Sequence, residues 1–147
     1  MKKMILLLIG IIPFVLGFLM NSWLMQNPNS ILPFKLIGIT FLVFWVFVGF
    51  ITCKFEKTPY HSALFIHTPA VIALLLLTYQ DMVLEQFWPN MIGLATQFYY
   101  LPLTNISSFI IGGGLYVQMW TASVVAFLLM YGSYYLGCYL KKILSSK

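Results

Sequence analysis

The sequence predicts an all-α integral membrane protein: a four-helix bundle with an interfacial outer segment, itself able to form a helix, between the third and fourth spans. Hydrophobic residues make up 61% of the 147 residues and charged residues only 7%, whereas soluble domains carry about 25% charged residues. The apolar residues fall in long runs, and lysines stand near the ends of these runs. So little charge cannot cover a water-facing surface, so we expect residues 1–147 to form one transmembrane domain in contact with the lipid bilayer.

The first predicted span covers about residues 4–25, a length of about 33 Å as a helix, which is enough to cross a bilayer. The basic start Met1-Lys2-Lys3 resembles that of a signal peptide. No small-residue cleavage motif follows the apolar run, so we predict an uncleaved helix. Gly10 and Gly17 share one face, which favours close packing against a neighbouring helix.

The second predicted span covers about residues 33–53, and the third covers about residues 62–80. Gly38 and Gly49 fall on one face of the second span and form part of a packing seam. Pro69 lies in the first third of the third span, where it should bend the helix and free the carbonyl of Phe65.

The segment 81–114 lacks an apolar run of about 18 residues, so no span is predicted there. Its aromatic side chains favour the depth of the lipid headgroups, and Trp88, Tyr99 and Tyr100 are the predicted interfacial anchors. The run Gly112 to Gly114 predicts a flexible entry to the fourth span.

The fourth predicted span covers about residues 115–140. Small residues near one of its faces form a second packing seam: Ala122, Ala126, Ser133 and Gly137.

The lysines predict the orientation. In a four-span arrangement all of them except Lys35 fall on one side, so both termini are predicted in the cytoplasm and residues 81–114 outside. A five-span alternative, with residues 91–111 inserted, would move the C-terminal lysines outside and is disfavoured. Cys53 and Cys138 then lie at the cytoplasmic face, where thiols stay reduced. The Met-Lys-Lys start and the use of lysine alone among strongly basic residues favour a bacterial plasma membrane.

A polar stripe runs along the third span and beyond it. Thr78, Asp81 and Glu85 all fall within about 40° of His67 on a helical wheel. Ionisable groups inside a membrane are candidates for a proton or cation path. The structural alternative is a neutral His67 that hydrogen-bonds a neighbouring helix or the carbonyl freed by Pro69.

Asp81 and Glu85 could bind a cation or a basic partner, or act as paired carboxylates. Two carboxylates without a third ligand give little metal specificity, so no metal site and no cofactor are predicted. The structural alternative is a solvated span end that holds the helix in register.

Three functions remain open. The leading hypothesis is a non-enzymatic accessory, scaffold or immunity-type subunit that packs against a membrane-protein partner or against copies of itself, because the chain has two small-residue seams and no catalytic motif. The second is a small oligomeric transporter or channel that uses the polar stripe. The third is an enzyme that modifies lipid at the outer leaflet. Nucleic acid is excluded as a partner because the lysines lie at span ends.

Overall fold

The computed structural model describes residues 2–29, 31–56, 58–112 and 118–145. Four helical stretches in this part are long and apolar enough to cross a membrane, which confirms the predicted fold class. The first of them is interrupted at Ile11 and is therefore two helices. In chain order the helices are α1 (Lys2–Gly10), α2 (Ile12–Gln26), α3 (Phe34–Thr52), α4 (Pro59–Met82), α5 (Met91–Ile111) and α6 (Met119–Leu144). The chain is therefore a small multi-pass membrane protein.

The helix ends follow local signals. α4 starts at Pro59, before the predicted position 62, because Thr58 caps it by accepting a hydrogen bond from the His61 N–H. Pro69 lies inside α4 without ending it. α6 continues to Leu144, past the predicted end at residue 140. The predicted start at residue 115 and most of the glycine run lie outside the described residues.

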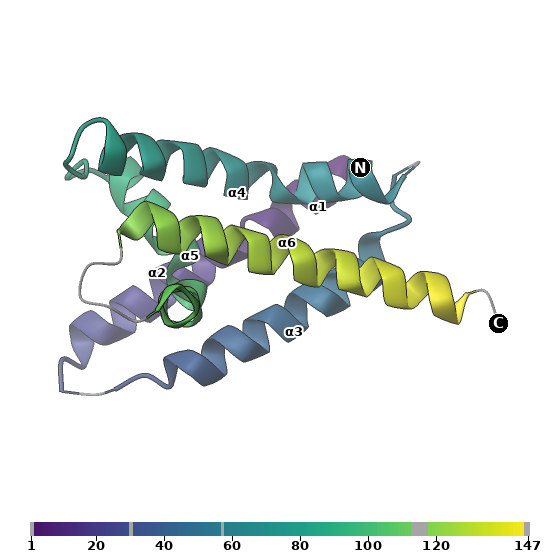
Figure 1. Cartoon of the computed structure of the whole chain (residues 1–147), viewed down its shortest axis with the longest axis horizontal. Coiled ribbons are helices and arrows are strands. Elements are labelled where there is room, and N and C mark those ends of the chain that lie inside the picture. Colours follow the sequence, from purple (N-terminus) through teal and green to yellow (C-terminus); the bar gives the residue numbers. More distant parts are fainter. Residues whose placement is uncertain (1, 30, 57, 113–117, 146–147) are drawn as a thin grey trace.

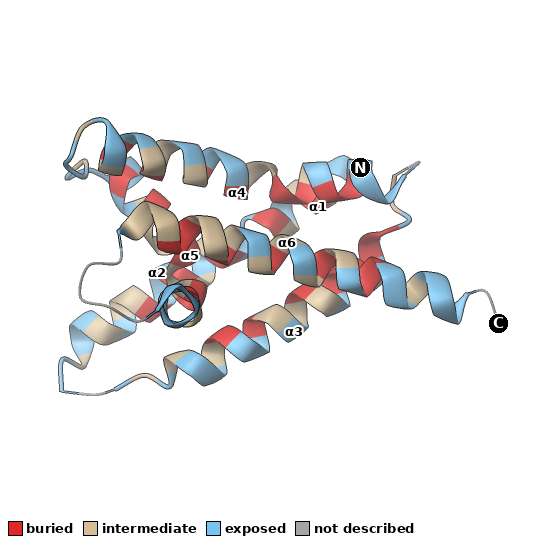
Figure 2. Cartoon of the chain, viewed as in Figure 1, coloured by how far each residue is buried: buried red, intermediate tan, exposed pale blue. Residues whose placement is uncertain are grey.

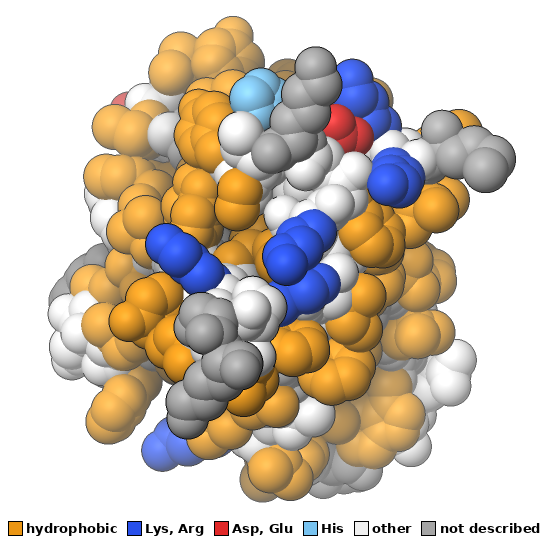
Figure 3. Space-filling model, turned by 90° about the vertical axis from the view of Figure 1, so that its right-hand side faces the viewer, with side chains coloured by type: hydrophobic (Ala, Val, Ile, Leu, Met, Phe, Trp, Pro, Cys, Tyr) orange, Lys and Arg blue, Asp and Glu red, His pale blue; other side chains and the backbone are white. Residues whose placement is uncertain are grey.

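The spans lie side by side, and four helix ends meet at one end of the bundle (Figure 1). α1 starts there, α3 ends there, α4 starts there and α6 ends there, which brings together Lys3, Lys54, Lys141 and Lys142. We call this the lysine-rich end. Figure 3 shows lysines gathered on this face, among hydrophobic side chains.

Helix α5, which covers residues 91–111, is not among the four candidate spans. Figure 1 shows part of it end-on, so this part crosses the long axis of the bundle. Its backbone lies directly against α2 and α3. A Cβ at Gly17 would lie 1.8 Å from the Phe98 carbonyl oxygen, and a Cβ at Gly38 would lie 3.1 Å from the Pro102 carbonyl oxygen. α5 therefore packs between two spans.

The other glycines of the predicted seams are also used within the chain. A Cβ at Gly49 would lie 2.1 Å from the Tyr134 carbonyl oxygen, and one at Gly137 would lie 2.0 Å from that of Val46. These two glycines thus bring α3 and α6 into backbone contact. Gly10 does the same between α1 and α4, because its Cβ would lie 2.3 Å from the Ile66 carbonyl oxygen.

Buried residues lie on the helix faces that turn toward each other (Figure 2). Ala122 and Ala126 of the fourth-span seam are buried, and Ser133 is half-buried. The opposite faces expose large apolar side chains, such as Val43 at 62% and Leu75 at 65%. An exposed apolar surface of this kind is what contact with lipid requires.

Replacement of Gly17 by Ala should destabilise the fold, because the new methyl group would overlap the Phe98 carbonyl. Overpacking of this kind costs about 1–3 kcal/mol. The measurement is the thermal unfolding midpoint of the purified protein in detergent.

The matched control is Gly132→Ala, because a Cβ at residue 132 meets nothing within 4 Å. This change should leave the midpoint unchanged or raise it, since Ala is favoured over Gly inside a helix by about 0.5–1 kcal/mol. Equal effects of the two substitutions would contradict the contact between α2 and α5.

Candidate functional site

The residues of the predicted polar stripe do not come together. His67 points into the bundle and is 2% exposed. Thr78 is half-buried, and Glu85 is exposed beyond the end of α4. Asp81 accepts a hydrogen bond from the backbone N–H of Trp120 at 2.9 Å, and so caps the start of α6. These residues do not form a continuous line of contacts. A proton or cation path along the stripe therefore stays a prediction.

Aromatic rings enclose the imidazole of His67. Its Nδ1 lies 2.9 Å from the Ala63 carbonyl oxygen and must carry the proton of this bond, since a carbonyl only accepts. The hydrogen-bond partner of His67 is thus a carbonyl one turn back in α4. It is neither a group on a neighbouring helix nor the carbonyl freed by Pro69, which were the two predicted partners. The rings around it have centroids 5.1 to 6.1 Å away and belong to Trp45, Phe127, Tyr131 and Tyr134.

Two buried nitrogen atoms in this cage lack hydrogen-bond partners among the described residues: Nε2 of His67 and Nε1 of Trp45. With the proton on Nδ1, Nε2 is an acceptor, whereas Nε1 of Trp45 is a donor. The cage packs α3, α4 and α6 against one another.

A polar connection that the sequence did not reveal joins the end of α4 to the start of α5. The fully buried Gln80 donates through Nε2 to Thr96 Oγ1 at 3.1 Å. Its Oε1 accepts from the Trp88 backbone N–H at 2.9 Å. Gln80 stands outside the stripe on the helical wheel, so its position next to Asp81 was the only available signal.

Tyr99 and Tyr100 lie inside the bundle and not at its surface, at 4% and 2% exposure, whereas the third predicted anchor, Trp88, is half-buried. Tyr99 donates to the Gly10 carbonyl, and Tyr100 donates to the Ala70 carbonyl, each at 2.6 Å. Both acceptors lie near the middle of their spans. Burial raises the pKa of both hydroxyl groups above its ordinary value, so they remain donors.

The break between α1 and α2 explains the first of these bonds. In an unbroken helix the Gly10 carbonyl would accept from the N–H of Phe14. Here that N–H donates to the Ile11 carbonyl instead, and Pro13 follows the break. A backbone carbonyl left free in apolar surroundings is costly, and the Tyr99 hydroxyl satisfies it.

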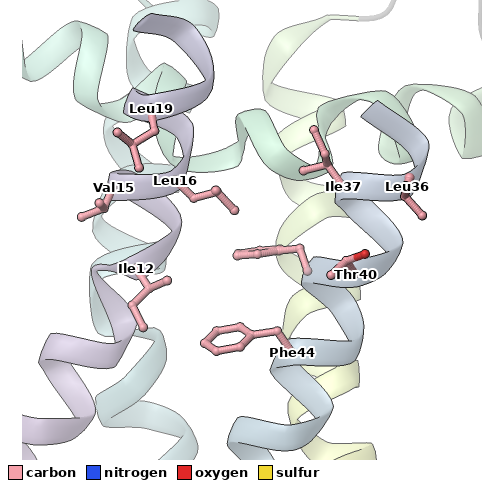
Figure 4. Close-up of a pocket in the computed structure, with 9 residues that line it drawn as sticks. Ile12, Val15, Leu16, Leu19, Leu36, Ile37, Thr40 and Phe44 are labelled. Atoms are coloured by element: carbon pink, nitrogen blue, oxygen red, sulfur yellow. The ribbon is translucent and has the colours of Figure 1, made fainter. Parts of the chain in front are cut away.

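An apolar groove with a volume of about 630 Å³ lies between α2 and α3. We call it the α2–α3 groove. Figure 4 shows side chains from the two helices facing each other across it. Thr40 is the only polar side chain in the lining, which consists of Ile12, Val15, Leu16, Leu19, Leu36, Ile37, Thr40, Phe41 and Phe44.

The groove follows from the position of α5. Gly17 and Gly38 let α5 approach α2 and α3 closely from the side, so the two spans are both held by α5. A second, smaller groove of about 460 Å³ lies where α5 packs beside α2 and α4, and it includes Pro69 and Tyr99. The α2–α3 groove is the better defined candidate, because its lining comes from two spans alone.

The lining of the α2–α3 groove restricts its chemistry. A single threonine hydroxyl supplies neither an acid and base pair nor a set of metal ligands. Within the described ranges, no three His, Cys, Asp or Glu side chains are grouped to hold a metal ion. Such a groove can bind an apolar chain by van der Waals contact.

The chain matches no protein family, no curated protein and no solved structure in comparisons of sequence and fold.

Replacement of Asp81 by Ala should destabilise the protein by about 0.5–2 kcal/mol, because the first turn of α6 would lose its cap. Thermal unfolding in detergent measures this loss. The control is Glu85→Ala, which removes an exposed carboxylate four residues further on, beyond the end of α4. If the two variants unfold at the same temperature, Asp81 does not cap α6.

Proposed function

We propose that this protein is a non-enzymatic accessory protein of the membrane whose binding surface is the α2–α3 groove, and that the groove holds the apolar chain of a membrane lipid. The observation that carries the proposal is a cavity of about 630 Å³ with an almost entirely apolar lining. This volume falls within the range of about 300–1,000 Å³ that ligand sites occupy.

The length of the groove favours a lipid chain over a partner helix. Its lining on α2 runs from Ile12 to Leu19, about 10 Å along the helix axis, and its lining on α3 runs from Leu36 to Phe44, about 12 Å. The hydrocarbon core of a bilayer is about 30 Å thick. The groove therefore covers less than one leaflet. A partner span would extend well past it, whereas the chain of a lipid from a single leaflet would not.

Packing by glycine seams gives less support to a protein partner than the sequence suggested. Gly17, Gly38, Gly49 and Gly137 all contact backbone within the same chain. They are thus not free to form a seam with a second protein. An accessory role then depends on the exposed surface, to which the α2–α3 groove opens.

The two rival functions rest on groups that the structure uses in other ways. A transporter would draw on His67, which is closed in by aromatic rings. A lipid-modifying enzyme would draw on Asp81, whose carboxylate caps α6. Neither group lines the α2–α3 groove.

The proposal predicts that Val15→Trp will reduce lipid binding, because Val15 lines the groove and the indole would occupy its space. The measurement is the yield of cross-linking to a phospholipid with a photoreactive acyl chain, in nanodiscs, with the modified peptides mapped by mass spectrometry. We expect wild-type labels on residues 12–19 and 36–44 and at least a severalfold loss in the variant.

The matched control is Val43→Trp, which adds the same side chain at an exposed position of α3 outside the groove lining. It should retain the wild-type yield. Labels spread evenly over all exposed faces, or equal yields in the two variants, would reject the α2–α3 groove as a lipid site.

A further inference from the structure

We infer that Cys53 and Cys138 form a redox-sensitive pair, which hydrogen peroxide converts to a disulfide bond between α3 and α6. The chain contains only these two cysteines, and both are free thiols. Cys53 directly follows α3, and Cys138 lies in the second half of α6. This inference goes beyond the proposed function and does not depend on lipid binding.

The two cysteines meet at the last turn of α3. The Cys138 thiol donates to the Gly49 carbonyl oxygen at 3.5 Å, and the Cys53 backbone N–H donates to the same oxygen at 3.1 Å. The Cys53 sulfur lies 3.9 Å from the next carbonyl oxygen in the chain, that of Phe50. The two thiol groups are close enough for a direct side-chain contact. The fold thus brings together two sulfur atoms that lie far apart in the sequence.

The backbones of α3 and α6 also approach closely beside the pair. A disulfide requires Cα atoms only about 4.4–6.8 Å apart, which side-by-side helices reach only where small residues allow it. Gly137 precedes Cys138, and a Cβ at this glycine would lie 2.7 Å from the Phe50 backbone nitrogen. A hydrogen bond of 3.2 Å joins the hydroxyls of Tyr134 and Thr52 next to this contact. The two helices are therefore already held together where the bond would form.

Burial determines which oxidant can reach the thiols. Cys53 is 4% exposed and Cys138 is 8% exposed, so a bulky reagent cannot reach either sulfur, whereas hydrogen peroxide is small. Two ammonium groups lie nearby, because Lys54 follows Cys53 and Lys141 donates to the Ile51 carbonyl at 3.2 Å. Neighbouring cations favour the thiolate, which is the form that reacts. We therefore expect slow oxidation by peroxide and little reaction with bulky reagents.

The oxidation proceeds in two steps. One thiolate attacks an oxygen of the peroxide, so that an S–O bond forms, the O–O bond breaks, and the released hydroxide takes the thiol proton to give water. The second thiolate then attacks the sulfenic sulfur, so that the S–S bond forms and the S–O bond breaks with release of a second water. The two sulfurs together lose two electrons, and one peroxide is reduced to two waters.

The bond would act on the whole bundle. It closes a loop that contains α4 and α5, and a disulfide across so long a loop strongly restricts the unfolded chain. In the orientation that the lysines predict, the pair lies on the cytoplasmic side, where thiols are normally reduced and a disulfide forms only transiently. Oxidation would therefore switch the bundle from a reduced form to a more rigidly linked form, and reduction would reverse the change.

The test exposes the purified full chain in detergent to hydrogen peroxide and then counts free thiols by maleimide uptake after denaturation. The reduced chain should take up two maleimides and the oxidised chain none, and dithiothreitol should restore both thiols. The oxidised chain should remain a monomer. Its thermal unfolding midpoint should rise by about 10 °C.

The matched control combines Cys138→Ser with Tyr139→Cys, which keeps two thiols but moves one of them to a neighbouring position that is 61% exposed. Peroxide should form no disulfide within this chain and should not raise its midpoint. Two maleimides on the wild type after peroxide, a loss of thiols that dithiothreitol does not reverse, or a disulfide within the control chain would overturn the inference.

Discussion

The contact between α5 and Gly17 of α2 is the constraint on which the rest of the architecture depends. Only hydrogen at residue 17 leaves room for the Phe98 carbonyl oxygen, because a Cβ would lie 1.8 Å from it. This contact lets a helix that is not itself a candidate span lie between spans. One turn further along, α5 meets Gly38 of α3 through the Pro102 carbonyl. The two spans are consequently held by a shared neighbour, and the α2–α3 groove is the space that remains between them (Figure 4).

Backbone polarity explains why α5 is held so deeply. In apolar surroundings every free carbonyl needs a donor. The break after α1 frees the Gly10 carbonyl, and Tyr99 satisfies it. Tyr100 adds a second bond to α4, at Ala70. Each tyrosine also fills space in the core, since both are nearly fully buried. The same two side chains thus join helix packing to hydrogen bonding, and they hold α5 against the middle of the first and third spans.

The sequence was sufficient to predict the membrane spans, but it was insufficient to predict which helices pack against each other. Long apolar runs and lysines at their ends predicted four spans, because hydropathy and charge act locally. Gly17, Gly38 and Gly49 were predicted as packing positions, but a glycine does not indicate which helix approaches it. Tyr99 was predicted at the membrane surface, since its partner is 89 residues away and no local pattern records that bond. The α2–α3 groove could not be predicted at all, because it depends on how far apart two helices lie, and no sequence pattern records that distance.

The central claim is that α5 holds α2 and α3 apart and that their groove stays open in the bilayer. The most direct measurement is the distance between spin labels at residues 19 and 36, on opposite walls of the groove, with both native cysteines replaced by serine. Pulsed electron spin resonance in lipid nanodiscs should give one narrow distribution, and the same separation in detergent. A shift to the short distances of directly packed helices, or two interconverting populations, would show that the spans close over the groove and would contradict the account.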